Sequence, residues 1–230
     1  MSLDGMRKTH DWFRKPGSFD YTLEKIKCIN SAGIRSVIMT TVSSINIYEV
    51  PQIIDMVVEN GVNVFAFARY CPTAKEKHVG ISPLRYRELL DTCYHKFSEY
   101  EQNGCKTYFN RKDHLWTLYE YEEGLFQIPR NAQKGMIYGG CNCGNCHLTI
   151  LPSGDLYACR RFDSKVGNIF TDDPAKAWVG SQMENYRDYT KFQKCSKCEL
   201  LAFCRGCPAV SYGTSGDFYA PDPQCWKEIN

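Results

Sequence analysis

The sequence lacks any long hydrophobic run and any excess of charge of one sign. No stretch of its 230 residues approaches the roughly 18 apolar residues of a membrane-spanning helix, and residues 1–20 are charged and polar, unlike the core of a signal peptide. The 28 basic side chains nearly balance the 26 acidic ones, which leaves no basic field to attract a phosphate backbone. We therefore expect a cytoplasmic protein whose partners include neither a membrane nor nucleic acid.

The composition is that of a folded protein and is unusual only in cysteine. Hydrophobic residues make up 43% of the chain and charged residues 23%, which excludes a disordered chain; the length suits one large or two small domains. Nine of the 13 cysteines lie between Cys141 and Cys225, and only four lie in the first 140 residues. The two parts of the chain therefore need separate interpretations.

The first 103 residues alternate between helical and strand patterns. Residues 19–31 place apolar side chains at helical spacing, whereas residues 34–42 and 62–69 are short runs rich in β-branched and apolar residues. Two further helices are predicted at 46–60 and 83–103. The order helix, strand, helix, strand, helix is typical of parallel βα units, so the sequence predicts an α/β fold.

This α/β pattern is incomplete. Two central strands cannot close a parallel barrel, and Ser2-Leu3-Asp4-Gly5 has the composition of a strand exit. We therefore expect the last strands of a partial barrel, with its N-terminal half absent. Residues 104–135 are aromatic and charged without clear periodicity, which predicts a linker or covering segment. The expected domains are residues 1–103 and the cysteine-rich residues 136–230 on either side of that segment.

The cysteine-rich part has the spacing of metal ligands. Two-residue spacing lets a tight turn aim both sulfurs at one metal, and thiolates suit iron and zinc. Nine thiols suffice for two four-ligand sites. Disulfides are disfavoured in a reducing cytosol, but spacing alone leaves structural zinc and iron–sulfur clusters both open. The order is Cys141-x-Cys143-x2-Cys146, Gly154-x4-Cys159, Cys195-x2-Cys198-x5-Cys204-x2-Cys207 and Cys225.

Together these features resemble a radical S-adenosylmethionine (SAM) enzyme with a C-terminal SPASM domain. In the SPASM pattern a cysteine precedes the Gly-x4-Cys element, as Cys141 precedes Gly154 by 13 positions, and residues 150–159 resemble the hairpin that carries the next ligand. The other similar segments are Ser2-Leu3-Asp4-Gly5 with His10, Arg14 and Gly17-Ser18-Phe19, then residues 37–46, residues 65–69 with Pro72, Gly167-Asn168-Ile169, Cys204-Arg205-Gly206-Cys207 and Asp222-Pro223-x-Cys225.

The resemblance implies two auxiliary [4Fe–4S] clusters with interleaved ligands. The first would use Cys159 and Cys207 with two of the three upstream thiols; Cys141 and Cys146 are the favoured pair, and Cys143 is the alternative. The second would use Cys195, Cys198, Cys204 and Cys225. Four cysteines leave no open iron at the second cluster, which suits electron transfer or structural support.

The resemblance also implies a SAM site at the carboxyl ends of the barrel strands. Thr41, Ser43 and Asn46 follow one predicted strand and Arg69 closes the next, which is the edge where barrel enzymes bind ligands. Each of two residues has an alternative to a SAM contact. Asn46 could instead cap the helix that it precedes, and Arg69 could be an exposed residue at the end of its strand.

One essential element of radical SAM chemistry is missing from this sequence. The family holds its SAM-cleaving [4Fe–4S] cluster with a Cys-x3-Cys-x2-Cys loop, and no such triplet occurs here. The other cysteines, Cys28, Cys71, Cys93 and Cys105, are isolated and are interpreted as buried or inert thiols. We therefore expect SAM and a third cluster only in a longer enzyme.

The resemblance is closest to enzymes that modify ribosomally made peptides by hydrogen abstraction. Arg160 and Arg161 follow Cys159 and could bind a peptide carbonyl or carboxylate, or could be a solvated pair. An aspartate at the position of Arg160 would suggest sulfatase maturation, so that branch is disfavoured. An electron donor such as a flavodoxin or ferredoxin is the implied partner. The alternatives are a zinc- or cluster-binding interaction module without catalysis and a stand-alone electron carrier.

Overall fold

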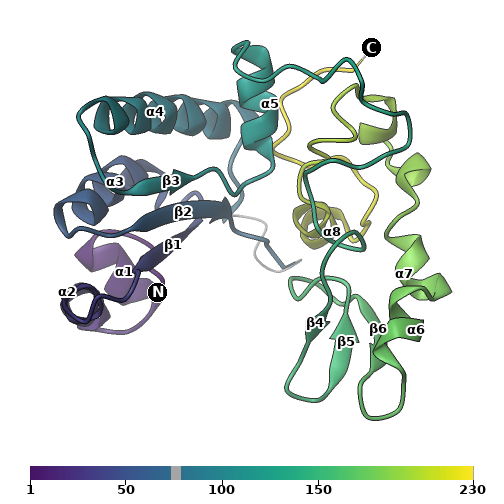
Figure 1. Cartoon of the computed structure of the whole chain (residues 1–230), viewed down its shortest axis with the longest axis horizontal. Coiled ribbons are helices and arrows are strands. Elements are labelled where there is room, and N and C mark those ends of the chain that lie inside the picture. Colours follow the sequence, from purple (N-terminus) through teal and green to yellow (C-terminus); the bar gives the residue numbers. More distant parts are fainter. Residues whose placement is uncertain (74–78, 230) are drawn as a thin grey trace. The chain divides into compact units, whose positions relative to one another are not determined.

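The computed structural model of the chain describes residues 1–73 and 79–229. In this part the chain divides into two compact units (Figure 1). The first unit contains residues 1–70 and 79–119, and the second contains residues 71–73 and 120–229.

The first unit is built on a parallel sheet with the strand order β1-β2-β3. β1 (Val37–Val42) pairs with β2 (Val64–Arg69), and β2 pairs with β3 (Tyr108–Asn110). On the free side of β1, Ser2 forms a parallel bridge with Met39, so the N-terminal residues extend the sheet. This position agrees with the interpretation of residues 2–5 as a strand exit.

Helices connect and cover these strands, as the alternating pattern predicts. α3 and α4 pack against each other beside the strands (Figure 1). The strand predicted from residue 34 begins only at Val37, because the Ile34 amide still donates to the Ile29 carbonyl and ends the preceding helix. The helical elements are α1 (Arg7–Phe13), α2 (Ser18–Ser31), the 3₁₀ turn η1 (Ile47–Glu49), α3 (Val50–Glu59), α4 (Pro83–Gln102) and α5 (Leu115–Glu122).

Residues 104–135, where the sequence predicts a linker or covering segment, contain β3 and α5. Phe109 of β3 stacks on Phe97 of α4 with ring centroids 4.3 Å apart, and Trp116 of α5 is buried beside Phe97. Their aromatic side chains are therefore part of the core. A three-residue strand is too short to show a period of two, which is why the sequence did not predict it. The predicted domain boundaries stay a prediction.

The second unit contains an antiparallel sheet with the order β4-β5-β6 and a series of short helices. Its core gathers Leu156, Met183, Phe192 and Phe218 around the sheet. The hairpin predicted over residues 150–159 is confirmed. The elements are β4 (Thr149–Ile150), β5 (Asp155–Tyr157), β6 (Lys165–Asn168), α6 (Pro174–Trp178), α7 (Ser181–Asn185), the 3₁₀ turns η3 (Tyr189–Lys191) and η4 (Cys195–Lys197), and α8 (Pro208–Ser215).

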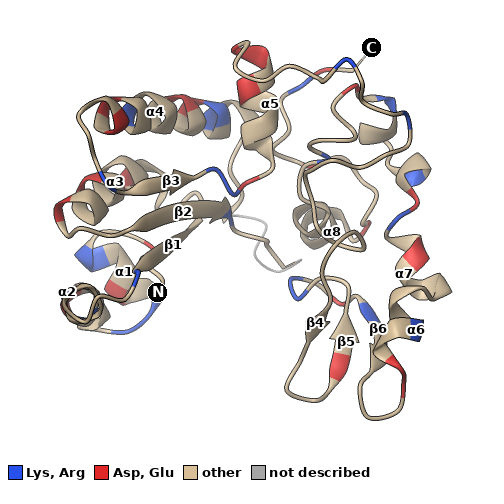
Figure 2. Cartoon of the chain, viewed as in Figure 1, with Lys and Arg blue, Asp and Glu red and all other residues tan. Residues whose placement is uncertain are grey.

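Charged residues of both signs occur in each unit, for example along α4 (Figure 2). Over residues 1–73 and 79–229, no helix combines the length and the apolar composition that a membrane crossing requires.

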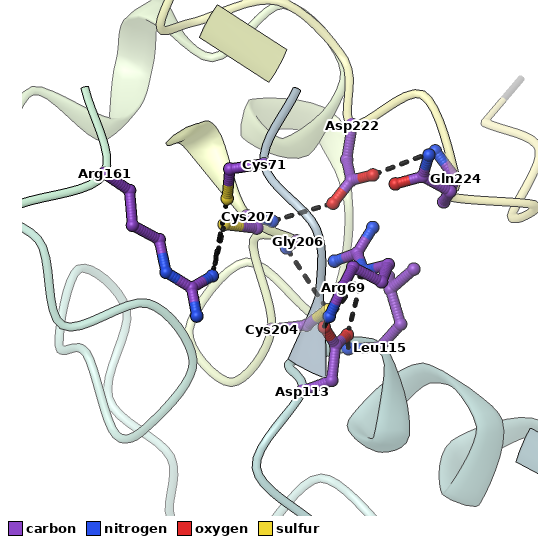
Figure 3. A network of polar contacts seen from close by, with 10 residues as sticks. All are labelled: Arg69, Cys71, Asp113, Leu115, Arg161, Cys204, Gly206, Cys207, Asp222 and Gln224. Carbon is purple, nitrogen blue, oxygen red and sulfur yellow. Dashed lines mark hydrogen bonds and ion pairs between the residues drawn. The ribbon is translucent and has the colours of Figure 1, made fainter. Parts of the chain in front are cut away.

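A buried ion pair fixes the carboxyl end of β2. Arg69 is 2% exposed, and its Nε donates to Oδ2 of Asp113 at 3.0 Å (Figure 3). The other carboxylate oxygen of Asp113 accepts the Leu115 amide at 3.1 Å, where α5 begins. The pair therefore ties the last residue of β2 to the start of α5. The alternative of Arg69 as an exposed strand-end residue is wrong, because the Asp113 carboxylate compensates its buried charge.

Removing one partner of this pair would leave an uncompensated buried charge. We expect Asp113→Ala to lower the free energy of unfolding by about 3–5 kcal/mol. We expect the double variant Arg69→Met with Asp113→Leu to recover most of that loss. Denaturant unfolding of the three chains measures both effects; equal stability of Asp113→Ala and the natural sequence would contradict the account.

The same pair predicts a pH dependence. Burial alone would raise the pKa of Asp113, but the Arg69 charge and its hydrogen bond lower the pKa below the ordinary value. A carboxyl with a lower pKa in the folded than in the unfolded chain adds stability above its unfolded pKa of about 3.9, and that stability is lost as the pH falls through the folded value. We therefore expect stability to fall below about pH 4. Asp113→Asn should show a smaller fall in urea titrations over the same pH range.

Candidate functional site

The hairpin of β4 and β5 holds Cys159 at its end. Gly154 in the turn has φ +83°, and a Cβ there would lie 2.4 Å from the Phe170 ring, so glycine is required for two reasons. Beyond β5, the Ser164 hydroxyl donates to the Cys159 carbonyl at 2.8 Å and accepts its amide at 2.9 Å. These local contacts hold Cys159 in a fixed position at the end of the Gly-x4-Cys element.

A strained loop, Cys204–Cys207, carries two of the predicted ligands. Arg205 and Gly206 both have left-handed backbone, with φ of 63° and 59°. The Gly206 amide donates to Cys204 Sγ at 3.4 Å. Arg205 donates to the Cys141 carbonyl at 2.7 Å and to the Leu201 carbonyl at 3.0 Å, which links this loop to the upstream cysteines. The strain at Arg205 is thus offset by hydrogen bonds of its side chain.

The Asp222 carboxylate anchors the same loop. It accepts the Cys207 amide at 2.7 Å and the Gln224 amide at 2.9 Å, and it is buried (Figure 3). A Cβ on Gly206 would lie 2.5 Å from an Asp222 oxygen, so the loop approaches the carboxylate closely only because residue 206 is glycine. The sequence analysis gave Asp222 no role. Its only signal was its place in the Asp-Pro-x-Cys motif.

The first group of thiols gathers Cys141, Cys143, Cys159 and Cys207. A hydrogen bond from the Cys143 thiol lowers the pKa of Cys159 to about 6. Burial, and to a smaller extent the neighbouring Cys207 and Cys159 thiols, raises the pKa of Cys141 to about 12. The amide of Cys143 also donates to Cys141 Sγ at 3.4 Å. These four sulfurs are therefore close neighbours in a largely buried place.

The structure separates the three upstream thiols. Cys143 is 5% exposed and lies beside Cys159, whereas Cys146 is exposed. The sequence analysis favoured Cys146 as the partner of Cys141, but in the structure Cys143 is the thiol that donates a hydrogen bond to Cys159. The ligand set stays a prediction. Sequence spacing could not distinguish the two, because both lie within a few residues of Cys141.

The second group gathers Cys195, Cys198, Cys204 and Cys225. Burial raises the pKa of Cys195 to about 12, with smaller contributions from Cys225 and Cys198. Burial also raises the pKa of Cys204, which has Cys225 and Cys195 as neighbours. All four belong to the short turns around η4 and the C-terminal segment. The interleaving is visible in the Cys204–Cys207 loop, whose first cysteine belongs to this group and whose last belongs to the other.

The donor set of both groups fits iron–sulfur clusters. Each group offers four cysteine sulfurs, the ligand type that [4Fe–4S] clusters use, and amide groups donate to several of the sulfurs, for example from Leu200 to Cys198. In the part of the chain that the structure describes, no three His, Cys, Asp or Glu side chains converge as ligands of one metal ion. The fit therefore rests on the type, number and burial of the thiols.

The residues predicted to contact SAM lie at the carboxyl edge of the first unit's sheet. Asn46 is buried; its amide group donates to the carbonyls of Asp4 and Thr41 at 2.8 Å and accepts the Ser43 amide at 2.8 Å. Asp4 in turn accepts the Thr41 amide and pairs with Arg14. The structure thus brings Thr41, Ser43 and Asn46 together with Asp4. Asn46 makes no side-chain cap of the following helix. Their SAM contacts stay a prediction.

Arg69 ends the neighbouring strand in register with Val42 and is held by Asp113. Sequence analysis missed Asp113, because an acidic residue in a segment without periodicity gives no sign of its tertiary partner.

Comparison with known sequences finds one family model that matches the cysteine-rich part and several relatives that match most of the chain. The family model of SPASM, an iron-sulfur cluster-binding domain, matches residues 141–208. The chain is 27% identical over 237 residues to the AdoMet-dependent heme synthase of Nitratidesulfovibrio vulgaris, covering 98% of this chain and 63% of the synthase. It is 23% identical over 240 residues to the mycofactocin maturase MftC of Mycobacterium tuberculosis, covering 98% and 56%.

Solved structures of similar proteins agree in fold. Streptococcus suis SuiB bound to S-adenosylmethionine matches with a TM-score of 0.72 at 20% identity, covering 99% of this chain and 53% of SuiB. The peptide-bound anSMEcpe structure, which also holds AdoMet, matches with a TM-score of 0.72 at 17% identity, covering 98% and 64%. This chain spans less than two thirds of the curated relatives and solved chains named here. The chain thus shares the α/β fold of SuiB and anSMEcpe, and its residues 141–208 match the SPASM iron–sulfur cluster-binding domain.

Proposed function

We propose that this chain is the C-terminal part of a radical SAM/SPASM enzyme that modifies a peptide or protein substrate by hydrogen abstraction. In this proposal the chain binds two auxiliary [4Fe–4S] clusters. The observation that carries the proposal is the arrangement of eight thiols in two groups that share the Cys204–Cys207 loop. The match of residues 141–208 to an iron–sulfur cluster-binding domain supports it.

The proposed ligands of the first cluster are Cys141, Cys143, Cys159 and Cys207, and those of the second are Cys195, Cys198, Cys204 and Cys225. When bound, such clusters supply one-electron transfer or support for the substrate. The role of the chain is to bury the sulfurs, to donate amide hydrogens to them, and to fix the spacing of the two groups through the anchored loop.

The proposed substrate class rests on the relatives. MftC is named a maturase, SuiB has also been solved with the precursor peptide SuiA, and anSMEcpe with the peptide Cp18Cys. A second candidate is a tetrapyrrole, because the relatives include a heme synthase at 27% identity. Titration of the anaerobic chain with Fe-coproporphyrin III tests this candidate: a saturable shift of the porphyrin absorbance would favour the tetrapyrrole, and unchanged absorbance the peptide.

The remaining parts of the proposed activity belong to the whole enzyme. They are SAM, a third [4Fe–4S] cluster on a Cys-x3-Cys-x2-Cys loop, and an electron donor such as a flavodoxin or ferredoxin. No such cysteine triplet occurs in these 230 residues, so no step of SAM cleavage is assigned to them.

Metal content tests the proposal. We expect the chain, purified anaerobically and reconstituted with iron and sulfide, to hold about eight irons and about eight sulfides. Reduction should produce two electron paramagnetic resonance signals. Two tightly held zinc ions without sulfide would contradict the proposal and would instead support a non-catalytic interaction module.

Single substitutions test the choice between Cys143 and Cys146. We expect Cys143→Ala to lose one cluster, leaving about four irons, because a buried ligand is removed. The matched variant Cys146→Ala should keep about eight, because that thiol is exposed. Iron and sulfide analysis of both chains measures the outcome. Loss of iron from Cys146→Ala alone would restore the ligand pair that the sequence favours.

A further inference from the structure

Arg161 directs its guanidinium group at two sulfur atoms of the second unit. Its Nη1 lies 3.4 Å from Cys71 Sγ and 3.9 Å from Cys207 Sγ (Figure 3). Cys207 is a proposed ligand of the first cluster, whereas Cys71 is not in either ligand set. The sequence analysis interpreted Arg161 as a peptide-binding or solvated residue, and this contact with thiols corresponds to neither.

Cys71 is held beside Cys207 by the packing of the residue that follows it. Pro72 is buried, and its carbonyl oxygen approaches α8 so closely that a Cβ on Gly213 would lie 1.8 Å from it. Cys71 and Cys159 also pack against the apolar cluster of Cys207, Ala209 and Val210. The position of Cys71 therefore depends on a close contact with a helical glycine, which no spacing of cysteines could predict.

The charges near the two thiol groups differ. At the first group, the Arg161 guanidinium contacts Cys207 Sγ, and the Arg205 guanidinium donates a hydrogen bond to the Cys141 carbonyl. At the second group, the Lys194 ammonium donates to the Cys225 carbonyl at 3.1 Å, and the Lys227 ammonium is paired with the Glu199 carboxylate at 3.1 Å, so the contact of a cation with a sulfur atom distinguishes the first group. A positive group or a hydrogen bond to sulfur stabilises the more negative, reduced state of a cluster. The first group therefore has a local feature that favours reduction.

We propose that Arg161 raises the reduction potential of the first auxiliary cluster through its contact with Cys207, with Cys71 as a non-ligating thiol that holds the guanidinium in place. This inference rests on the proposed function, since it requires that the first group binds a cluster. Arg161 acts through a ligand, so it is a positioning residue and not a catalytic one. The direct consequence is that loss of the guanidinium lowers the potential of the first cluster and leaves that of the second unchanged.

Redox titration of the reconstituted full chain, followed by electron paramagnetic resonance, tests the proposal. The Cys143→Ala chain, which should retain only the second cluster, identifies which signal belongs to which cluster. We expect Arg161→Gln to lower the equilibrium constant for one-electron reduction of the first cluster at least tenfold, or about 59 mV, with the second unchanged. Arg161→Lys should retain part of the effect because it keeps the charge.

Arg160 provides the matched control, since it is also an exposed arginine but, unlike Arg161, makes no hydrogen bond to a sulfur among the described residues. Arg160→Gln should shift the potential of the first cluster by much less. Equal shifts in the two variants, or no shift in Arg161→Gln, would overturn the proposal. If the natural chain binds no cluster, the proposed function fails first, and the two failures are thereby distinguishable.

Cys71→Ala tests the part assigned to the thiol. We expect its iron content to equal that of the natural chain, and the potential of the first cluster to change, because the guanidinium loses one of its two sulfur contacts. Cys105→Ala, at a cysteine of the first unit, should change neither quantity. Loss of about four irons from Cys71→Ala would make Cys71 a cluster ligand and would overturn the role assigned here.

Discussion

The candidate site depends on two hydrogen bonds, which the Asp222 carboxylate accepts from the amides of Cys207 and Gln224. They fix the Cys204–Cys207 loop, in which Arg205 and Gly206 both have left-handed backbone. This loop supplies one cysteine to each thiol group. The positions of two proposed clusters are thus coupled through one short loop and one buried carboxylate. That coupling gives a physical reason for the interleaved order of the cysteines.

The parts of the fold that follow from local patterns could be predicted from the sequence. The β-branched and apolar runs became β1 and β2, and the Gly-x4-Cys element became a hairpin because its turn needs a positive φ, which glycine adopts without strain. β3 could not be predicted, since its three residues show no period and its place depends on the stacking of Phe109 on Phe97. The sequence indicates where regular elements form but not which short segments pack between them.

For the candidate site as well, some features could be predicted from the sequence and others depend on tertiary structure. The cysteine spacing and the family resemblance predicted the candidate thiols, but the choice between Cys143 and Cys146 depends on burial, which is a tertiary property. Arg160 and Arg161 are identical in type and adjacent in the chain, yet only Arg161 has a hydrogen bond to the thiols in the described part of the chain. Such differences arise from loop geometry, and no periodicity or motif encodes them.

The anchoring of the shared loop is the claim most directly open to measurement. In Asp222→Asn, an NH₂ group replaces one of the two oxygens that accept the Cys207 and Gln224 amides. Mössbauer spectroscopy of the ⁵⁷Fe-reconstituted chain, with Asp217→Asn as the control, reports both clusters at once. The account predicts that Asp222→Asn lowers the iron bound in both clusters together while the control retains it. Two intact clusters with unchanged spectra in Asp222→Asn would contradict the account.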